Sequence, residues 1–438
     1  MDLHIQLHHS GRWHNAARVE LADPNLGIAG ASLTGYETDY VFGDWNTAGL
    51  ASAERVIDGH ALSIALPVGL DRHRGTRWPG FLVDMMPQGH VRRRIAEELE
   101  ASPDDPRIDI TLLLRGAGNS IGNLRVREAW EQEQERAAGE EFIGLTMDDI
   151  LDASDRFVEA AEKYALIATG SSGVQGEWPK LLMTRRNDSL WHPDSLVPDD
   201  DAQEHVLVKM VRGNKPVDLT ILSSEVPYLE VARAFGLRVG KPLRYRRGQL
   251  VIPRFDRIAT NRSVVRLGQE SLISSLGRAE YSPIIAHEAC LKLIQSVTAA
   301  PAAETVEYVL RDLLNLAMGN PDNHGRNTAL QKFHDGTIKL SPLYDFAPMR
   351  IDEAAIARST KWRVMEGRDF HPDWAKVAQV AAGKVMDVNK LKDILRQKAP
   401  FIRDLPAIAR KHGVAEDVIE RALVRCDEIA DSLEQIGK

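Results

Sequence analysis

The sequence contains little cysteine, no long apolar run and no excess of basic residues. Its two cysteines, Cys290 and Cys426, lie far apart in the 438-residue chain, which argues against a disulfide framework and fits a reducing cytosol. The longest apolar-looking run, residues 61–70, is too short to span a bilayer. The first residues, MDLHIQLHHSGRW, lack the basic start and apolar stretch of a signal peptide. We therefore expect a cytoplasmic protein without a membrane partner.

The charge balance also argues against general binding of nucleic acid by this chain. The formal net charge is -8, from 55 basic and 63 acidic residues. A chain this acidic is a poor general binder of nucleic acid, because phosphate contacts require a basic surface. The apolar content of 43% and the charged content of 27% are those of an ordinary globular protein. The length allows two or three domains.

The first part of the chain, to about Val126, mixes predicted strands and helices. Residues 2–7 and 61–66 alternate like strands, and a helix is expected over residues 85–100. Residues 128–141 are highly charged, which indicates either a solvated helix or a linker. We place a domain boundary near them.

The middle of the chain is richer in strands. Strands are predicted over residues 164–168, 179–184 and 205–210, and an apolar-spaced helix over residues 223–235 ends at Gly236. A hairpin is predicted around Arg247-Gly248, between strands at residues 243–245 and 250–252.

The last third is mainly helical. After Ser282 the helical pattern is interrupted by one hairpin, centred on Asp335-Gly336, and residues 374–438 form a helical tail. A strand-rich lobe followed by a helix-rich lobe is the order of a protein kinase. The sequence therefore predicts the α+β fold class.

The strongest chemical signal is the stretch GNPDNHGRN at residues 319–327. It contains Asp322 and Asn327, five residues apart, the spacing of a kinase catalytic loop. There the aspartate accepts the proton of the substrate hydroxyl and the asparagine binds a metal ion. The alternative is an ordinary turn, since Asn, Pro, Asp and Gly are common turn residues.

A second aspartate supports the kinase interpretation. The hairpin around Asp335-Gly336 is expected to bring its two ends side by side, which places Asp345 next to Asn327. An aspartate and an asparagine there are able to share magnesium ions. In kinases this aspartate opens an Asp-Phe-Gly segment, whereas here the segment reads Asp-Phe-Ala. The alternative role for Asp345 is a helix N-cap.

Three weaker signals precede these two in the order found in kinases. Lys209 lies on a predicted strand, from which a lysine reaches ATP phosphates, although strand lysines often face solvent. Glu225, near the start of the next predicted helix, is a candidate partner for Lys209 or a favourable charge at a helix N-terminus. The glycine-rich residues 169–176 suit a phosphate-binding loop, or simply a flexible hairpin.

With these residues in place, the sequence resembles the HipA family over nearly its whole length. The segments that carry the resemblance are LSIALP at residues 62–67, FLVDMMP at 81–87, RFDR at 254–257, NPDNHGRN at 320–327 and LSPLYDF at 340–346.

The resemblance implies a kinase-like fold with two lobes, an extra N-terminal β-rich subdomain and a helical C-terminal lobe. The implied domains are an N-terminal subdomain at 1–130, a kinase N-lobe-like region at 150–257 and a helical C-lobe at 258–438. It implies Asp322 as the catalytic base and Asn327 and Asp345 as magnesium ligands. The residues implied in ATP binding are Gly170, Ser171, Ser172, Gly173, Lys209, Glu225, Phe255, Asp256 and Asn327.

The resemblance further implies a serine/threonine protein kinase that uses ATP and Mg2+ and acts as the toxin of a toxin–antitoxin pair. Its implied partners are a protein substrate such as an aminoacyl-tRNA synthetase and a HipB-type DNA-binding antitoxin, with DNA bound only through that antitoxin. Growth arrest would follow. Two alternatives stay open: a small-molecule kinase of the aminoglycoside or choline type, and an inactive kinase-like corepressor.

The sequence departs from the family pattern at three places. Pro253 stands where the family often has a glutamate beside adenine. Arg326 stands in place of a lysine in the catalytic loop, which keeps the positive charge. The autophosphorylated serine of the family falls on a glycine, Gly170 or Gly173. Ser171 and Ser172 are therefore the candidate autophosphorylation sites.

Overall fold

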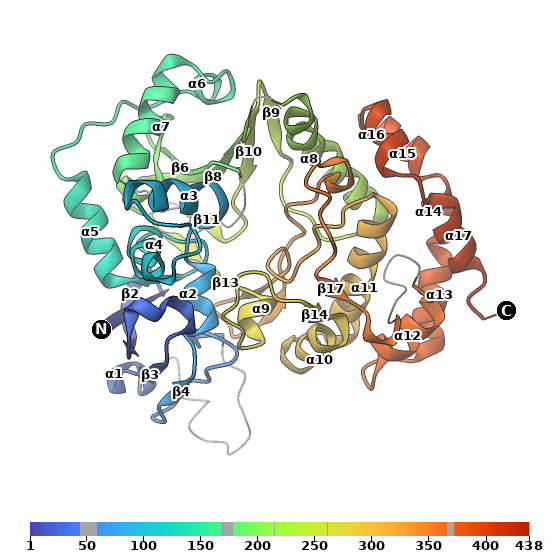
Figure 1. The fold of residues 1–438 in the computed structure, drawn as a ribbon, viewed down its shortest axis with the longest axis horizontal. Coiled ribbons are helices and arrows are strands. Elements are labelled where there is room, and N and C mark those ends of the chain that lie inside the picture. The colour runs from blue at the N-terminus through green and yellow to red at the C-terminus, as the bar shows by residue number, and fades with distance from the viewer. Residues whose placement is uncertain (44–58, 168–177, 214, 261, 366–371, 438) are drawn as a thin grey trace. The chain divides into compact units, whose positions relative to one another are not determined.

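The structure, a computed structural model, describes residues 1–43, 59–167, 178–213, 215–260, 262–365 and 372–437 (Figure 1). The chain forms two compact units. The first comprises Met1–Arg212, Leu243–Tyr281 and Gln331–Thr337, and the second comprises Gly213–Pro242, Ser282–Leu330 and Ile338–Lys438.

The first unit opens with an antiparallel sheet in the order β4-β3-β2-β1-β5. Every second residue of β1 is apolar, and Leu3, Ile5 and Leu7 are fully buried because successive strand side chains face opposite sides. The elements of this part are β1 Asp2–His9, β2 Arg12–Leu21, β3 Ser32–Tyr36, α1 Thr38–Val41, β4 His73–Gly75, α2 Gly80–Asp84, α3 Gly89–Glu98, α4 Asp109–Gly116, β5 Leu124–Val126 and α5 Arg127–Ala137.

A second antiparallel sheet of the first unit has the order β7-β6-β8-β10-β9. Leu181, Val206, Val208 and Val251 form its core together with Phe157. The elements here are α6 Met147–Leu151, α7 Asp155–Ile167, β6 Lys180–Arg186, β7 Trp191–Pro193, β8 Ala202–Met210, β9 Arg244–Arg246, β10 Gln249–Pro253, β11 Arg257–Ala259, β12 Val264–Arg266, β13 Gly268–Ser271 and α9 Leu272–Ser275.

The second unit is mainly helical. Its long helix α11 buries Leu310, Leu313 and Leu314, and a short hairpin of β15 and β16 follows. The elements are α8 Pro216–Phe235, β14 Ile285–Ala286, α10 His287–Val297, α11 Pro301–Ala317, β15 Ala329–Lys332 (whose last two residues belong to the first unit), β16 Ile338–Leu340, β17 Thr360–Lys361, α12 Trp374–Ala382, α13 Val388–Gln397, α14 Ala399–Arg403, α15 Leu405–Lys411, α16 Glu416–Ala422 and α17 Cys426–Glu434.

The α+β fold class predicted from sequence is confirmed. The hairpins at Arg247-Gly248 and Asp335-Gly336 are present, and Arg247 and Gly248 adopt φ values of 47° and 78°, the left-handed conformation of a tight two-residue turn. Residues 128–141 begin as a helix, α5. No helix of the described residues is long and apolar enough to cross a membrane.

Two predicted strands were wrong, and two predicted helices are present but start at other residues than predicted. Residues 164–167 continue helix α7 instead of forming a strand, because a short apolar run does not distinguish the two. Residues 61–66 contribute only an isolated bridge between Ser63 and Leu66. Helix α3 begins at Gly89, two residues after the helix-disfavouring Pro87. Helix α8 begins at Pro216, seven residues before its predicted start, because proline is well suited to a first helical position.

Candidate active site

The stretch at residues 319–327 forms a loop that begins where α11 ends. Gly319 adopts φ +64°, and a side chain there would place its Cβ 2.5 Å from the carbonyl oxygen of Ala422. Glycine is therefore required both by the backbone conformation and by the space. The N–H of Asn320 then donates to the carbonyl of Asn315 at 2.8 Å, which ties the loop to the last turn of α11.

Two buried amide side chains, Asn315 and Asn320, connect α11 to the backbone of Asp322 through hydrogen bonds. Asn315 Nδ2 donates to the carbonyl of Arg311, and its Oδ1 accepts from Asn320 Nδ2 at 2.7 Å. Asn320 Oδ1 in turn accepts from the N–H of Asp322 at 3.2 Å. Because each amide uses both its donor and its acceptor, the orientation of each is fixed by the next. The backbone of Asp322 is thus held by the helix.

The structure brings Asp322 and Asn327 together. Asn327 Nδ2 donates to the carbonyl of Asp322 at 2.9 Å, and its N–H donates to the carbonyl of His324 at 2.8 Å. With Nδ2 committed to Asp322, the side-chain oxygen of Asn327 is the atom it has to offer a metal ion. The Asp322 carboxylate is 29% exposed and lies 3.8 Å from His324 Nε2. It is therefore accessible to another molecule.

The hairpin returns the chain to the same loop. Ser341 donates its N–H to the carbonyl of Ala329 at 2.9 Å, and Arg311 Nη2 donates to the carbonyl of Ser341 at 2.6 Å. Tyr344 Oη donates to the carbonyl of Arg326 at 2.7 Å. The residue before Asp345 thus contacts the residue before Asn327, as the hairpin argument predicts.

Asp345 has an unusual backbone and is not a helix N-cap. Its φ is +53°, a left-handed conformation that Asp tolerates better than most residues and that is found often at functional sites. The next helical turn, Met349–Ile351, has Pro348 as its N-cap. Phe346 is buried, with its ring 5.3 Å from that of Tyr228 on α8, which anchors the segment. The N-cap alternative for Asp345 is therefore wrong.

A buried carboxylate on α11, Asp312, supports the loop from behind. Its Oδ1 accepts from Arg358 Nη2 and from Asn323 Nδ2, and its Oδ2 accepts from the Trp362 indole at 2.8 Å. His287 Nε2 lies 3.4 Å from Oδ1. Burial alone would raise the pKa of Asp312, but Arg358, His287 and the hydrogen bonds outweigh burial and hold that pKa well below its usual value. The Asp312 carboxylate is therefore charged at neutral pH.

Lys209 and Glu225 lie in different units, and each is described within its own. Lys209 is on β8, opposite Leu250 and Lys180, and is 2% exposed, with its Nζ 5.4 Å from the Trp178 ring centroid. It is therefore not a solvent-facing strand lysine. Glu225 is 1% exposed in the middle of α8. The alternative of a favourable charge at a helix start is wrong, because α8 begins nine residues earlier.

Asp256 lies in the first unit within a buried ionic cluster, and the partly buried Phe255 precedes it. The Asp256 carboxylate accepts from Arg254 Nη2 at 2.6 Å, Arg257 Nη1 at 2.7 Å and the N–H of Gly122 at 2.8 Å. These contacts outweigh burial and hold the pKa of Asp256 well below its usual value. Gln331 Nε2 donates to the carbonyl of Phe255 at 3.0 Å.

The remaining predicted nucleotide-binding residues fall outside the described part of the chain. They are Gly170, Ser171, Ser172 and Gly173, and the predicted autophosphorylation at Ser171 or Ser172 falls there too. Both stay predictions.

Sequence reasoning missed the residues that support the loop. Asn315, Asp312, Arg358 and Trp362 belong to no short motif, and their grouping depends on tertiary contacts between α11 and the segment after residue 345. One signal was available: Arg311 and Asp312 interrupt the apolar run of residues 308–314 on α11, where an unpaired buried charge would be costly.

The α+β fold, with this loop after an apolar helix and this returning hairpin, is kinase-like. Family models match at residues 49–127, as a HipA N-terminal domain, and at residues 172–403, as a HipA-like C-terminal domain. The Y4mE protein of Sinorhizobium fredii, whose name proposes a kinase, is 32% identical over 316 residues, covering 68% of this chain and 71% of that protein. The chain belongs to the HipA family.

A solved structure shares the fold. HipA in the Shewanella oneidensis MR-1 complex of HipA, HipB and operator DNA matches with a TM-score of 0.63 and 15% sequence identity, covering 100% of both chains.

Proposed function

We propose that this chain is an ATP- and magnesium-dependent serine/threonine protein kinase that acts as the toxin of a toxin–antitoxin pair. The observation that carries the proposal is the joining of the Asp322–Asn327 loop to the Asp345 segment by Tyr344 and the hairpin. Membership of the HipA family and the similarity to Y4mE support it.

In the proposed reaction, the Asp322 carboxylate accepts the proton of the substrate hydroxyl. Its backbone is held by the amides of Asn315 and Asn320, which suits a reaction that depends mostly on positioning. Proton acceptance also requires access to the substrate, and the partly exposed carboxylate provides it.

The metal role falls to Asn327 and Asp345. Their side-chain oxygens are hard donors, which magnesium prefers, and magnesium is usually held by one or two carboxylates together with substrate phosphates. Bound magnesium supplies charge neutralisation at the transferred phosphoryl group. The bond from Asn327 Nδ2 to the carbonyl of Asp322 leaves the side-chain oxygen of Asn327 for the metal ion, and Asp345 contributes its carboxylate from a left-handed backbone.

The nucleotide roles of the other predicted residues are part of the same proposal. Lys209 contacts the ATP phosphates and pairs with Glu225. Phe255 and Asp256 lie at the adenine, where the buried cluster around Asp256 gives that segment a fixed conformation. The glycine-rich residues 169–176 cover the phosphates.

A HipB-type DNA-binding antitoxin is the proposed partner. The Shewanella protein with this fold was solved with HipB and operator DNA, and the net charge of -8 disfavours direct DNA binding by this chain. The proposed substrate is a protein of translation such as an aminoacyl-tRNA synthetase, which rests on the family resemblance.

Phosphate transfer to different acceptors tests the proposal. Purified chain with labelled ATP and magnesium should label protein in a cell lysate but not a panel of aminoglycosides and choline. Label on the small alcohols alone would favour the small-molecule kinase. No label on any acceptor, with an unlabelled chain, would favour the inactive corepressor.

A further inference from the structure

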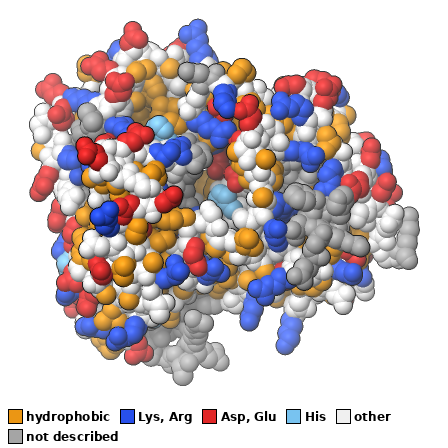
Figure 2. Space-filling view, in the orientation of Figure 1, with side chains coloured by type: hydrophobic (Ala, Val, Ile, Leu, Met, Phe, Trp, Pro, Cys, Tyr) orange, Lys and Arg blue, Asp and Glu red, His pale blue; other side chains and the backbone are white. Residues whose placement is uncertain are grey.

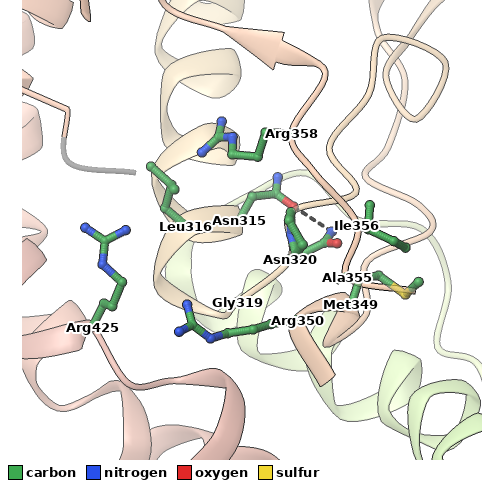
Figure 3. A pocket seen from close by; sticks show the side chains of 11 residues that line it. Asn315, Leu316, Gly319, Asn320, Met349, Arg350, Ala355, Ile356, Arg358 and Arg425 are labelled. Carbon is green, nitrogen blue, oxygen red and sulfur yellow. Dashed lines mark hydrogen bonds between the residues drawn. The ribbon is translucent and has the colours of Figure 1, made fainter. Parts of the chain in front are cut away.

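A cavity of about 240 Å³ lies in the second unit and is lined in part by the start of the loop that carries Asp322. Figure 3 shows the residues around it. Gly319, Asn320 and Pro321, the three residues before Asp322, form part of its wall. Of the eleven described residues that line it, three are arginines and none is acidic. The lining residues are Asn315, Leu316, Gly319, Asn320, Pro321, Met349, Arg350, Ala355, Ile356, Arg358 and Arg425.

Arg358 is the buried cation of this cavity. It is 4% exposed, and its Nη2 is bonded to Asp312. Its Nε and Nη1 are buried and make no hydrogen bond with any described residue. A buried donor left without an acceptor costs free energy, and Arg358 carries two such donors at the wall of this cavity.

Two further arginines reach the cavity from different segments, as Figure 3 shows. Arg350 follows the Asp345 segment, is exposed, and makes no ion pair with any described residue. Arg425, at the N-cap of α17, is bonded to Glu428 at 2.8 Å. Asp312 and Glu428 offset two of the three arginine charges, so Arg350 supplies the net positive charge at the cavity and is the cation most open to a ligand.

The rest of the wall combines the apolar side chains of Leu316, Met349 and Ile356 with the amides of Asn315 and Asn320. A mixed lining of this kind suits a side chain with an aliphatic stem and an anionic end better than a fully hydrated free ion, because the stem is buried while the head meets guanidinium groups. Glutamate and phosphoserine in a polypeptide have this form.

We infer that this cavity is an anion subsite, which binds a carboxylate or phosphate side chain of the polypeptide whose hydroxyl is presented to Asp322. The inference rests on the proposed function for the identity of the polypeptide, but the anion site itself does not. Acidic or already phosphorylated residues near the acceptor serine or threonine would then favour a substrate.

Inorganic phosphate is the first probe, titrated by calorimetry into the full chain without nucleotide. Arg350→Ala should weaken phosphate binding about tenfold, the change expected when one charge-assisted hydrogen bond is lost, and Arg350→Lys should recover part of it. The control Arg363→Ala removes another exposed positive charge of the same unit that does not line the cavity, and it should leave phosphate binding unchanged. Equal affinity in all four proteins, or no binding, overturns the inference.

Fluorescent serine peptides form the second probe, with either glutamates or glutamines flanking the serine. Polarisation should show at least tenfold tighter binding of the glutamate peptide, and Arg350→Ala should remove that preference. Equal binding of both peptides, with Arg350-dependent phosphate binding intact, overturns the polypeptide assignment. The kinase proposal can fail separately. In that case the wild-type chain transfers no phosphate but still binds inorganic phosphate through Arg350.

Discussion

Single residues at the candidate site divide into those that face a substrate and those that hold them in place. Asp322, Asn327 and Asp345 stand on irregular backbone, and in the proposed reaction their side-chain oxygens meet the substrate and magnesium. The backbone of Asp322 is held by the buried amides of Asn315 and Asn320, and the buried Asp312 carboxylate accepts from Asn323 of the same loop. This separation makes the effects of substitutions at the two groups distinguishable.

Asp345→Asn should remove most phosphate transfer while leaving the melting temperature unchanged. Asparagine tolerates the φ of +53° as aspartate does, so the fold is kept, whereas the negative charge offered to magnesium is lost. Transfer assays across a magnesium titration, with thermal melts in parallel, check this. Wild-type activity in a normally folded variant would remove Asp345 from the metal site.

A buried carboxyl in the first unit predicts a pH dependence of stability. Burial raises the pKa of Glu133, on α5, to about 7. Between pH 4.5 and 7 the folded chain therefore holds a proton that the unfolded chain has released, and the free energy of unfolding falls as the pH rises.

Glu133→Gln should remove that dependence. The free energy of unfolding of the variant should equal that of the wild type near pH 4. At pH 8 it should be higher by about 3 kcal/mol, since each pKa unit corresponds to about 1.4 kcal/mol. Chemical denaturation at pH 5, 6, 7 and 8 measures the difference. A difference that does not change with pH would show that Glu133 does not titrate in this range.

At the scale of elements, the candidate site depends on how α11 ends and how the β15–β16 hairpin returns. Gly319 at the end of α11 has φ +64° and no room for a Cβ, whereas Gly336 in the hairpin turn has φ +81° and open space around it. The two glycines share the strained backbone and differ only in the available space.

Gly319→Ala should lower the free energy of unfolding by about 3 kcal/mol and displace the loop. Gly336→Ala should lower it by only about 1 kcal/mol, because an alanine in the left-handed conformation is strained but meets no neighbouring atom. Denaturation midpoints of both variants check the difference, and transfer activity should fall only for Gly319→Ala. Equal costs would show that the contact with Ala422 is relieved by a small shift.

Some of these elements could be predicted from the sequence and others could not, and the difference has a physical cause. The Asp335-Gly336 hairpin was predictable because its turn residues act locally, and the five-residue spacing of Asp322 and Asn327 lies within one loop. Residues 164–167 were misassigned because an apolar run has no clear period. Asp312, Arg358 and the cavity beside them were not predictable, since they join segments about 46 residues apart that only the tertiary fold brings together.

For the whole molecule, charge is the property with the clearest consequence. The net charge is -8, and on the face seen in Figure 2 Lys and Arg side chains are interspersed with Asp and Glu. The chain alone should therefore give no gel shift with DNA at physiological salt, and binding should appear only with a basic partner. A specific shift by the purified chain alone would contradict this.

The central claim is that Asp322 serves phosphate transfer. The most direct measurement compares wild-type chain and Asp322→Asn, a substitution of the same shape, in a lysate with labelled ATP and magnesium. We predict labelled protein with the wild type and at least a hundredfold less with Asp322→Asn, because general-base catalysis contributes roughly 10²–10⁴-fold. Equal labelling by two equally folded proteins would contradict the account.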